Sequence, residues 1–143
     1  MSDEALTQEK HKYLDELNLC PDNIWFMDGG SLSNDSRIPV WRKEREEYGF
    51  DSRETWDLRS VFYIWLYERL RMYIDYASKI VNLNYYHFTY KDKEYTQREM
   101  IELILDRIRF FYSEEFDDLN EEHVSKISEI EDIWAMIVHA MWW

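Results

Sequence analysis

Residues 51–80 read DSRETWDLRSVFYIWLYERLRMYIDYASKI, and this stretch decides the fold class. Apolar residues recur along it at steps of three and four, the spacing of a helix that buries one face. The run Val61–Tyr67 is apolar on every side, so we expect a central helix over about residues 54–78 that is covered on several faces. Asp51 and Glu54 have the spacing of a capping box at its start. The expected buried face consists of Leu58, Phe62, Trp65, Leu66, Leu70, Tyr73 and Ala77.

The segment that follows alternates aromatic and polar residues. Tyr86, Phe88 and Tyr90 alternate with His87 and Thr89, which predicts a small β-hairpin near residues 86–96 with its turn at Asp92-Lys93. A lone hairpin is marginal in water, so it should lie against helices.

Two further helices are expected after the hairpin. Thr96 and Glu99 form a second capping box, and a final helix begins near Glu121. The first should bury Met100, Ile101, Ile104, Leu105, Ile108 and Phe111, and the second Ile127, Ile130, Ile133, Trp134, Ile137, Val138 and Met141. Because adjacent helical residues point about 100° apart, we expect Trp142 to be largely buried and Trp143 partly exposed.

The first third of the chain has weaker signals. Residues 1–18 predict an N-terminal helix over Ala5–Leu17, and residues 20–40 a long loop that includes Gly29-Gly30. The apolar residues 24–27 should pin this loop to the core. The expected fold is therefore mainly α: one compact domain over residues 1–143, with about four to five helices, one small hairpin and a helical core over residues 51–143.

Composition narrows the class of protein. Aromatic residues make up 17% of the chain while Gly 3 and Pro 2 are few, which favours long regular elements and argues against disorder. Cys20 is the single cysteine, so an intrachain disulfide is excluded. The acidic, polar start predicts no signal peptide, and no apolar run reaches the roughly 20 residues of a membrane span. We expect a protein of a reducing cytoplasm that does not enter the membrane.

The formal charge of −13 is distributed unevenly. Both ends of the chain are acidic while residues 36–112 are nearly balanced. Such a charge repels nucleic acid and attracts basic surfaces, so we expect no direct nucleic-acid binding. The most concentrated acids are Glu114, Glu115, Asp117, Asp118, Glu121 and Glu122. They predict either a surface that binds a basic protein groove or a plain solubilising connector, and both readings stay open.

Catalytic and metal-binding motifs are absent from the sequence. The four histidines share no metal-ligand spacing, and the sequence has no nucleophile elbow and no phosphate-binding glycine loop. We therefore predict no catalytic residues, no metal ligands and no cofactor. The alternative is an enzyme with an unrecognised site around His87, Arg53 and Glu54, and it requires these side chains to converge in one pocket.

Three segments resemble a group of small bacteriophage-encoded proteins that are largely uncharacterised. They are GFDSRETWDLRSVFYIWLYERLRMY (49–73), HFTYKDKEYTQREMIELI (87–104) and EDIWAMIVHAMWW (131–143). The resemblance implies a phage accessory protein and supplies no catalytic residues. The hypothesis it favours is a non-enzymatic inhibitor of a host or defence protein, of the anti-CRISPR kind, whose partner has a basic surface and itself binds nucleic acid. The acidic cluster would bind that surface with Trp25 or Trp143 as an anchor; a virion structural or assembly factor is the further alternative.

Overall fold

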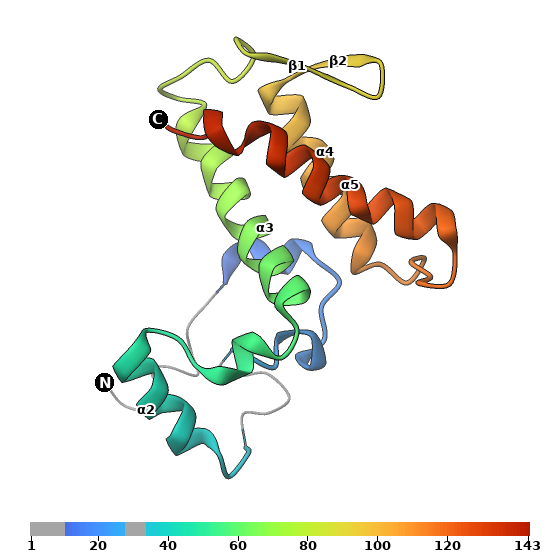
Figure 1. Cartoon of the computed structure of the whole chain (residues 1–143). Coiled ribbons are helices and arrows are strands. Elements are labelled where there is room, and N and C mark those ends of the chain that lie inside the picture. The colour runs from blue at the N-terminus through green and yellow to red at the C-terminus, as the bar shows by residue number, and fades with distance from the viewer. Residues whose placement is uncertain (1–10, 28–33) are drawn as a thin grey trace. The chain divides into compact units, whose positions relative to one another are not determined.

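The fold is mainly helical with one antiparallel hairpin, as predicted, in the computed structural model, which describes residues 11–27 and 34–143 (Figure 1). Within these residues the α-helices are α2 (Ile38–Tyr48), α3 (Leu58–Ala77), α4 (Gln97–Phe111) and α5 (Glu121–Ile137). The strands are β1 (His87–Tyr90) and β2 (Lys93–Thr96). Short 3-10 helices occupy Lys12–Glu16, Pro21–Ile24, Ser52–Thr55 and Val138–Ala140.

The chain groups into two compact units, residues 1–66 and residues 67–143, whose boundary falls inside α3. Each unit has its own buried side chains and is described by itself, and a single domain stays a prediction. In the described part of the chain, no helix is long and apolar enough to cross a membrane.

Helix α3 forms in the predicted place but is not covered on every side. Leu58 and Trp65, both expected in the core, are 66% and 44% exposed. The apolar run therefore has one buried face and one exposed face, because other residues pack against only part of the helix surface. The buried residues of α3 are Ser60, Tyr63, Ile64, Leu66, Tyr67, Leu70, Ile74 and Ala77.

The capping box at Asp51 exists but caps a different element. Asp51 accepts a hydrogen bond from the backbone N of Arg53, and Glu54 accepts one from the backbone N of Asp51, so the box closes the short 3-10 helix Ser52–Thr55. Helix α3 begins later, where the Asp57 carboxylate accepts from both the backbone N and the hydroxyl of Ser60. The expected helix start was wrong because a capping box does not distinguish a 3-10 turn from a long helix.

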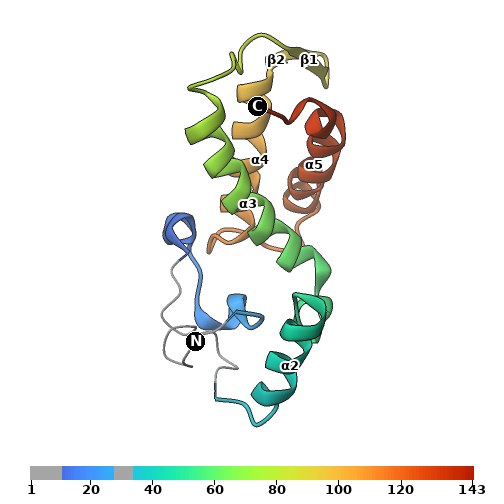
Figure 2. The ribbon, with the colours of Figure 1, turned by 90° about the vertical axis from the view of Figure 1, so that its left-hand side faces the viewer.

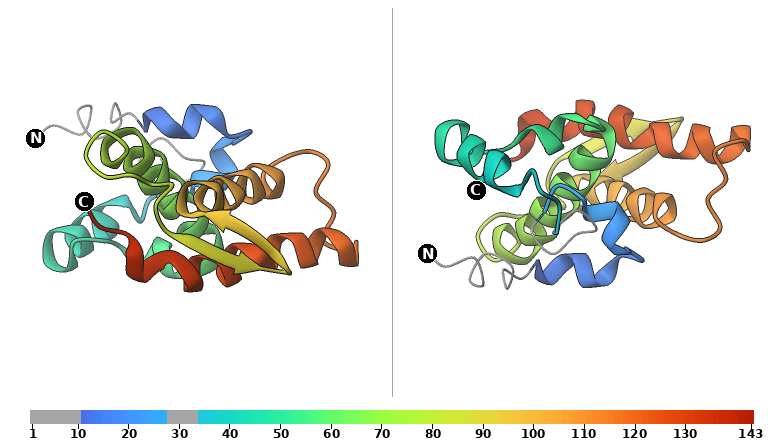
Figure 3. Two further views of the ribbon diagram at one scale, coloured as in Figure 1. Left: turned by 90° about the horizontal axis from the view of Figure 1, so that it is seen from above. Right: turned by 90° about the horizontal axis from the view of Figure 1, so that it is seen from below.

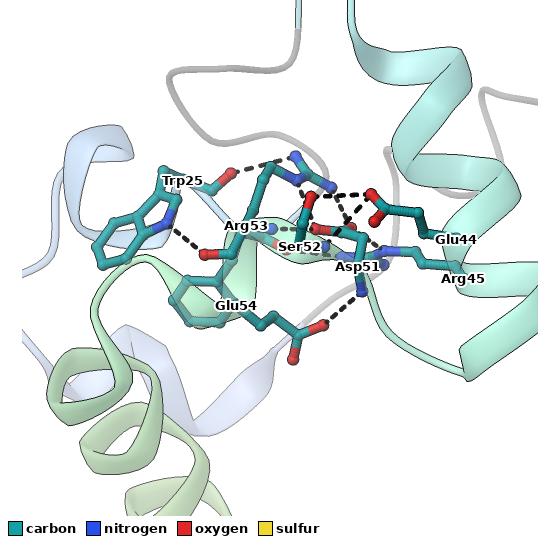
Figure 4. Close-up of polar contacts among 8 residues, drawn as sticks. Trp25, Glu44, Arg45, Asp51, Ser52, Arg53 and Glu54 are labelled. Atoms are coloured by element: carbon teal, nitrogen blue, oxygen red, sulfur yellow. Dashed lines mark hydrogen bonds and ion pairs between the residues drawn. The ribbon is translucent and has the colours of Figure 1, made fainter.

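The first unit is organised around the Asp51 carboxylate, which is 1% exposed (Figure 4). Arg53 donates to it from its backbone N, Nε and Nη2 at 2.9, 3.0 and 2.8 Å, and Arg45 donates from Nε at 2.5 Å. A carboxylate has about four acceptor positions, so these donors saturate it. This network ties α2, which carries Arg45, to the segment before α3.

The same two arginines hold the N-terminal loop. Arg53 Nη1 donates to the Trp25 carbonyl at 3.1 Å, and Trp25 Nε1 returns a hydrogen bond to the Arg53 carbonyl at 3.0 Å. Arg45 Nη2 donates to the Phe26 carbonyl at 2.6 Å. Phe26 is buried and Trp25 half-buried, so the prediction that this apolar stretch pins the loop is confirmed.

Trp41 of α2 forms the apolar side of this network. Its ring is 3% exposed and lies under the Arg53 guanidinium, whose Cζ is 4.4 Å from the ring centroid. Arg37 covers the same ring at 5.0 Å, and Trp56 meets it edge-on at 6.0 Å. The buried cation is thereby shielded by π-faces as well as paired with a carboxylate.

Parts of the expected N-terminal organisation lie outside the described residues. These are the predicted start of the first helix at Ala5 and the Gly29-Gly30 pair. Within the described part of the chain, residues Lys12–Glu16 form a 3-10 helix. The expected loop over residues 20–40 holds a second 3-10 helix and the first residues of α2.

The second unit is built on α4 and α5, which lie side by side (Figure 2). Thr96 and Glu99 form the predicted capping box at the start of α4, with hydrogen bonds of 3.2 and 2.9 Å. The predicted apolar faces are buried except at their edges, where Phe111, Trp134 and Met141 are half-buried and Val138 is exposed. The fully covered residues of the pair are Met100, Ile101, Ile104, Ile108, Ile130, Ile133 and Ile137.

The hairpin lies next to α5, as the view from above shows (Figure 3). Tyr90 OH donates to Asp132 at 3.2 Å, and Lys91 Nζ is 3.7 Å from a Glu129 oxygen. The turn residues are Lys91 and Asp92, with φ of 50° and 64°, one residue earlier than predicted. A two-residue hairpin turn of type I′ has positive φ at both central positions, and the pairing of Tyr90 with Lys93 leaves only these two residues for it.

The end of the chain differs from the prediction. Helix α5 ends at Ile137, a 3-10 turn follows, and Trp142 is 63% exposed rather than buried. Trp143 is 55% exposed, and its ring meets that of Tyr76 with the centroids 6.3 Å apart. Because the helix stops before Val138, the residues after it no longer follow the apolar stripe of α5.

The buried ion pair generates a prediction for stability. Asp51→Asn should lower the free energy of unfolding by about 3–5 kcal/mol, since it leaves the Arg53 charge buried without its counter-charge. The measurement is urea denaturation followed by circular dichroism. Asp35→Asn is the matched control, because Asp35 pairs with the exposed Arg37 on the surface and its loss should change the denaturation midpoint little. Equal loss in both variants would contradict the assigned role of Asp51.

Asp51 also predicts a dependence of stability on pH. Burial raises its pKa, but the hydrogen bonds from Arg53 and Arg45 outweigh burial and hold the pKa below its ordinary value. The folded state therefore binds fewer protons than the unfolded state at this site. Its stabilisation is complete above the unfolded pKa of about 3.9 and is lost as the pH falls through the lower, folded value. The free energy of unfolding should fall more steeply below about pH 4 in the wild type than in Asp51→Asn; parallel curves would refute this.

Candidate functional site

The six predicted carboxylates lie together in the connection between α4 and α5 and in the first turn of α5, a segment that we call the acidic connector (residues 113–122). All six are exposed, and among the described residues none of them forms an ion pair. The sequence prediction placed the cluster correctly because the residues are consecutive in the chain. The residues are Glu114, Glu115, Asp117, Asp118, Glu121 and Glu122.

The connector backbone is held in place by an aromatic contact. The Phe116 ring packs against Phe110 and Phe111, with centroids 5.8 and 5.2 Å apart. His123 stacks on Phe116 and also meets Phe110 at 4.9 Å. The backbone N of Asp117 donates to His123 Nδ1 at 3.1 Å, which fixes the middle of the connector to the first turn of α5.

Asn120 fixes the end of the connector. Its side-chain oxygen accepts from the backbone N of Glu122 at 3.0 Å and of His123 at 3.3 Å, a helix N-cap. Glu121 and Glu122 lie in the first turn of α5, where negative charge is stabilised by the helix dipole. These two acids therefore have a structural explanation, whereas Glu114, Glu115 and Asp118 have none in the part of the chain that the structure describes.

An open hollow of about 580 Å³ lies beside the connector. Its charged lining has four acids and two bases, so it is locally negative. Both bases are already engaged: Lys126 Nζ lies 4.3 Å from the Phe110 centroid, and Arg107 pairs with Asp106 at 2.7 Å. The hollow is suited to a basic side chain. Its lining residues are Arg107, Phe110, Glu115, Glu121, Glu122, His123, Ser125, Lys126 and Glu129.

Sequence reasoning missed part of this arrangement. The sequence assigns no role to His123, which has no metal-ligand spacing, yet its ring organises the connector. Arg107, Phe110 and Glu129 line the hollow from two helices, and only the packing of α4 against α5 brings them together. The signal available in the sequence was the aromatic pattern of Phe110, Phe111 and Phe116 around the acids.

Of the two tryptophans predicted as anchors, Trp143 belongs to the same unit as the connector and Trp25 to the other unit. Trp143 is exposed, but it follows the C-terminal end of α5 while the connector precedes its N-terminal end. Since 17 residues of α-helix span about 25 Å, Trp143 and the acids do not form one small surface. Trp25 is half-buried in the first unit, with its indole N–H engaged by the Arg53 carbonyl. Within the second unit, the structure thus brings the six acids together and leaves Trp143 out, whereas a contribution of Trp25 stays a prediction.

The alternative catalytic site draws its residues from both units, Arg53 and Glu54 from the first and His87 from the second, so their convergence stays a prediction. Arg53 is buried in the first unit and donates to Asp51 and Trp25, while Glu54 accepts from the backbone of Asp51. His87 belongs to the second unit, where its exposed ring lies 3.2 Å from Glu94. Within the described residues, no group of three or more His, Cys, Asp or Glu is placed to hold a metal ion.

Comparison with known proteins finds no matching family model, no matching curated protein and no matching solved structure. The chemistry of the acidic connector therefore has to be judged from its own geometry.

The N-cap of α5 predicts how firmly the connector is held. Asn120→Ala should cost about 1 kcal/mol of stability and increase amide hydrogen exchange at residues 117–123, since two backbone N–H groups lose their acceptor. Ser128→Ala is the control. The Ser128 hydroxyl donates a hydrogen bond to the Ser125 carbonyl within α5, and both residues lie outside the connector. Unchanged exchange in Asn120→Ala would show that aromatic packing alone holds the connector.

Proposed function

We propose that this chain is a non-enzymatic interaction protein, a phage accessory protein that binds and inhibits a host or defence protein through the acidic connector. The observation that supports this is the connector itself: six exposed carboxylates, without ion-pair partners among the described residues, on a backbone held by Phe116, His123 and Asn120. A surface ordered in advance loses little conformational entropy when it binds.

The partner that fits this surface is a protein with a basic groove, such as one that itself binds nucleic acid. The connector presents negative groups at close spacing, as a phosphate backbone does, and the chain carries a net charge of −13. Charges of this kind raise the rate of encounter and select a positively charged partner. The locally negative hollow beside the connector can receive one basic side chain of that partner.

Three carboxylates without a structural role allow a sharp test. The variant Glu114→Gln/Glu115→Gln/Asp118→Asn removes three charges and keeps the side-chain shapes. Exposed ion pairs contribute roughly 0.2–1 kcal/mol each, so we expect about tenfold weaker binding of the partner. The affinity should also fall as ionic strength rises from about 0.05 to about 0.5 M, because screening shortens the range of the attraction.

A control variant removes the same charges elsewhere. Asp22→Asn/Glu46→Gln/Glu47→Gln also replaces one Asp and two Glu at exposed positions, all of them in the first unit. The three proteins are used in parallel as baits in host lysate, with quantitative mass spectrometry, and the affinity of each captured candidate is then measured with purified protein. A partner retained by the wild type and the control but lost by the connector variant supports the proposal. A partner bound equally by all three proteins refutes the connector as the binding surface.

A further inference from the structure

A second pocket lies at the other end of α5, where the chain terminates. It has a volume of about 230 Å³, below the usual size of a drug-binding pocket and suited to one small group. Its walls come from α3, the α3–β1 connection, the start of α4 and the chain end. The lining residues are Tyr73, Val81, Asn82, Tyr85, Tyr86, Gln97, Ala140 and Trp142.

Aromatic rings dominate this pocket, and several are unusually exposed. Tyr85, Tyr86 and Trp142 are 71%, 46% and 63% exposed, although apolar rings are normally covered. Tyr85 and Tyr86 meet edge to face, with centroids 5.3 Å apart, so their faces point in different directions. The exposed rings border a concave site, where a ligand could cover them.

Hydrogen bonds to the backbone of Trp142 hold this residue in its exposed position. Tyr73 OH donates to the Trp142 carbonyl at 3.0 Å, and the backbone N of Trp142 donates to the Ala140 carbonyl at 3.1 Å. The Ala140 carbonyl also accepts from Gln97 Nε2 at 3.2 Å. The main chain is thereby tied to α3 and α4, while the indole remains at the pocket.

Gln97 supplies a polar group that its own fold does not use. The residue is 2% exposed. Because the Ala140 carbonyl can only accept, the amide nitrogen must face it, which settles the orientation of the side chain. Among the described residues, no donor is bonded to Gln97 Oε1, although its Nε2 contacts Ala140, Tyr73 and Met141. Oε1 is not among the fully enclosed side-chain atoms that lack a partner in the described residues, so it keeps contact with solvent and is open to a ligand.

The charge of the pocket indicates which ligand fits. Its described lining carries no charged side chain, its aromatic faces are electron-rich, and the Gln97 oxygen adds an acceptor. Aromatic faces attract cations, most strongly where water is excluded. An anion finds no cationic side chain in the lining, where a neutral amide such as that of Asn82 offers it only an uncharged donor. A neutral apolar ligand offers the Gln97 oxygen neither an N–H donor nor the positively polarised N–CH groups of a quaternary ammonium.

We propose that this aromatic pocket binds an organic cation, an alkylammonium or guanidinium group, between Trp142, the tyrosines and the Gln97 amide oxygen. The cation could be a free small molecule or a Lys, methyl-Lys or Arg side chain of another protein, since both present the same chemistry. The pocket is about 25 Å from the acidic connector along α5, beyond the Debye length of about 8 Å. The proposal therefore stands independently of the function proposed above.

The test compares a cation with its neutral isostere. Choline and 3,3-dimethylbutan-1-ol have the same shape, and each is titrated into the full chain while the Trp142 indole N–H and the Gln97 side-chain amide are followed by NMR. Choline should shift both signals saturably and bind more tightly than the alcohol, by between about twofold and about thirtyfold. Equal affinity of the two probes, or no saturable shift with any probe, would overturn the proposal.

Neighbouring tryptophans provide matched variants. Trp142→Ala removes a pocket wall, whereas Trp143→Ala removes an equally exposed ring that contacts Tyr76 instead. We expect choline affinity to fall at least about fivefold in Trp142→Ala and to stay within about twofold in Trp143→Ala. Tyr85→Leu, at a ring that is 71% exposed, should behave like Trp142→Ala without loss of fold. Equal losses in the two tryptophan variants would count against the pocket.

Two further titrations distinguish a free small molecule from a protein side chain as the source of the cation. Neutral peptides with a single trimethyllysine or a single arginine are titrated in the same way. Tighter binding of choline than of either peptide points to a free small molecule, and the reverse order points to a side chain of a protein partner. The triple connector variant should bind every probe as the wild type does, so failure of the connector proposal and failure of this one are distinguishable.

Discussion

The Asp51 carboxylate is the group on which the first unit depends. A buried charge is tolerated only when it is paired and hydrogen-bonded, and Asp51 accepts four hydrogen bonds from Arg45 and Arg53. The remaining donors of the two arginines reach the Trp25 and Phe26 carbonyls, so one ion-pair network joins α2, the N-terminal loop and the start of α3. A short segment with little aliphatic core is organised in this way by polar contacts that require a specific geometry.

The second unit follows a different physical rule. Its core is aliphatic, with isoleucines from α4 and α5 at almost zero exposure, and it needs no buried charge. Such packing is strong but not directional, so the ends of the helices are positioned by separate polar contacts. Asn120 and His123 hold one end of α5, and Tyr73 and Gln97 hold the other. Both proposed binding regions are found at these ends, where the backbone is fixed but the side chains are not needed for the core.

The acidic connector and the C-terminal pocket both suit positively charged ligands, but through different interactions. The connector would attract a basic surface through formal charge, an effect that salt screens. The C-terminal pocket would hold a single cation against π-faces and one amide oxygen, a short-range contact that salt affects less. The chain would thus carry two distinct binding regions. The connector would attract a partner over a longer distance, and the C-terminal pocket would select the chemical group that is bound.

The sequence by itself determined the helical class, the hairpin, the apolar faces of α4 and α5 and the position of the acidic cluster, because each is written in local spacing or in consecutive residues. Only the tertiary structure decided that Trp65 and Trp142 are exposed, that the Asp51 box caps a 3-10 turn, and that Gln97 meets the end of the chain. Those outcomes depend on which surfaces meet and on where a helix stops. Periodicity predicts which residues share a face, but whether that face is covered is decided by contacts between residues far apart in the chain.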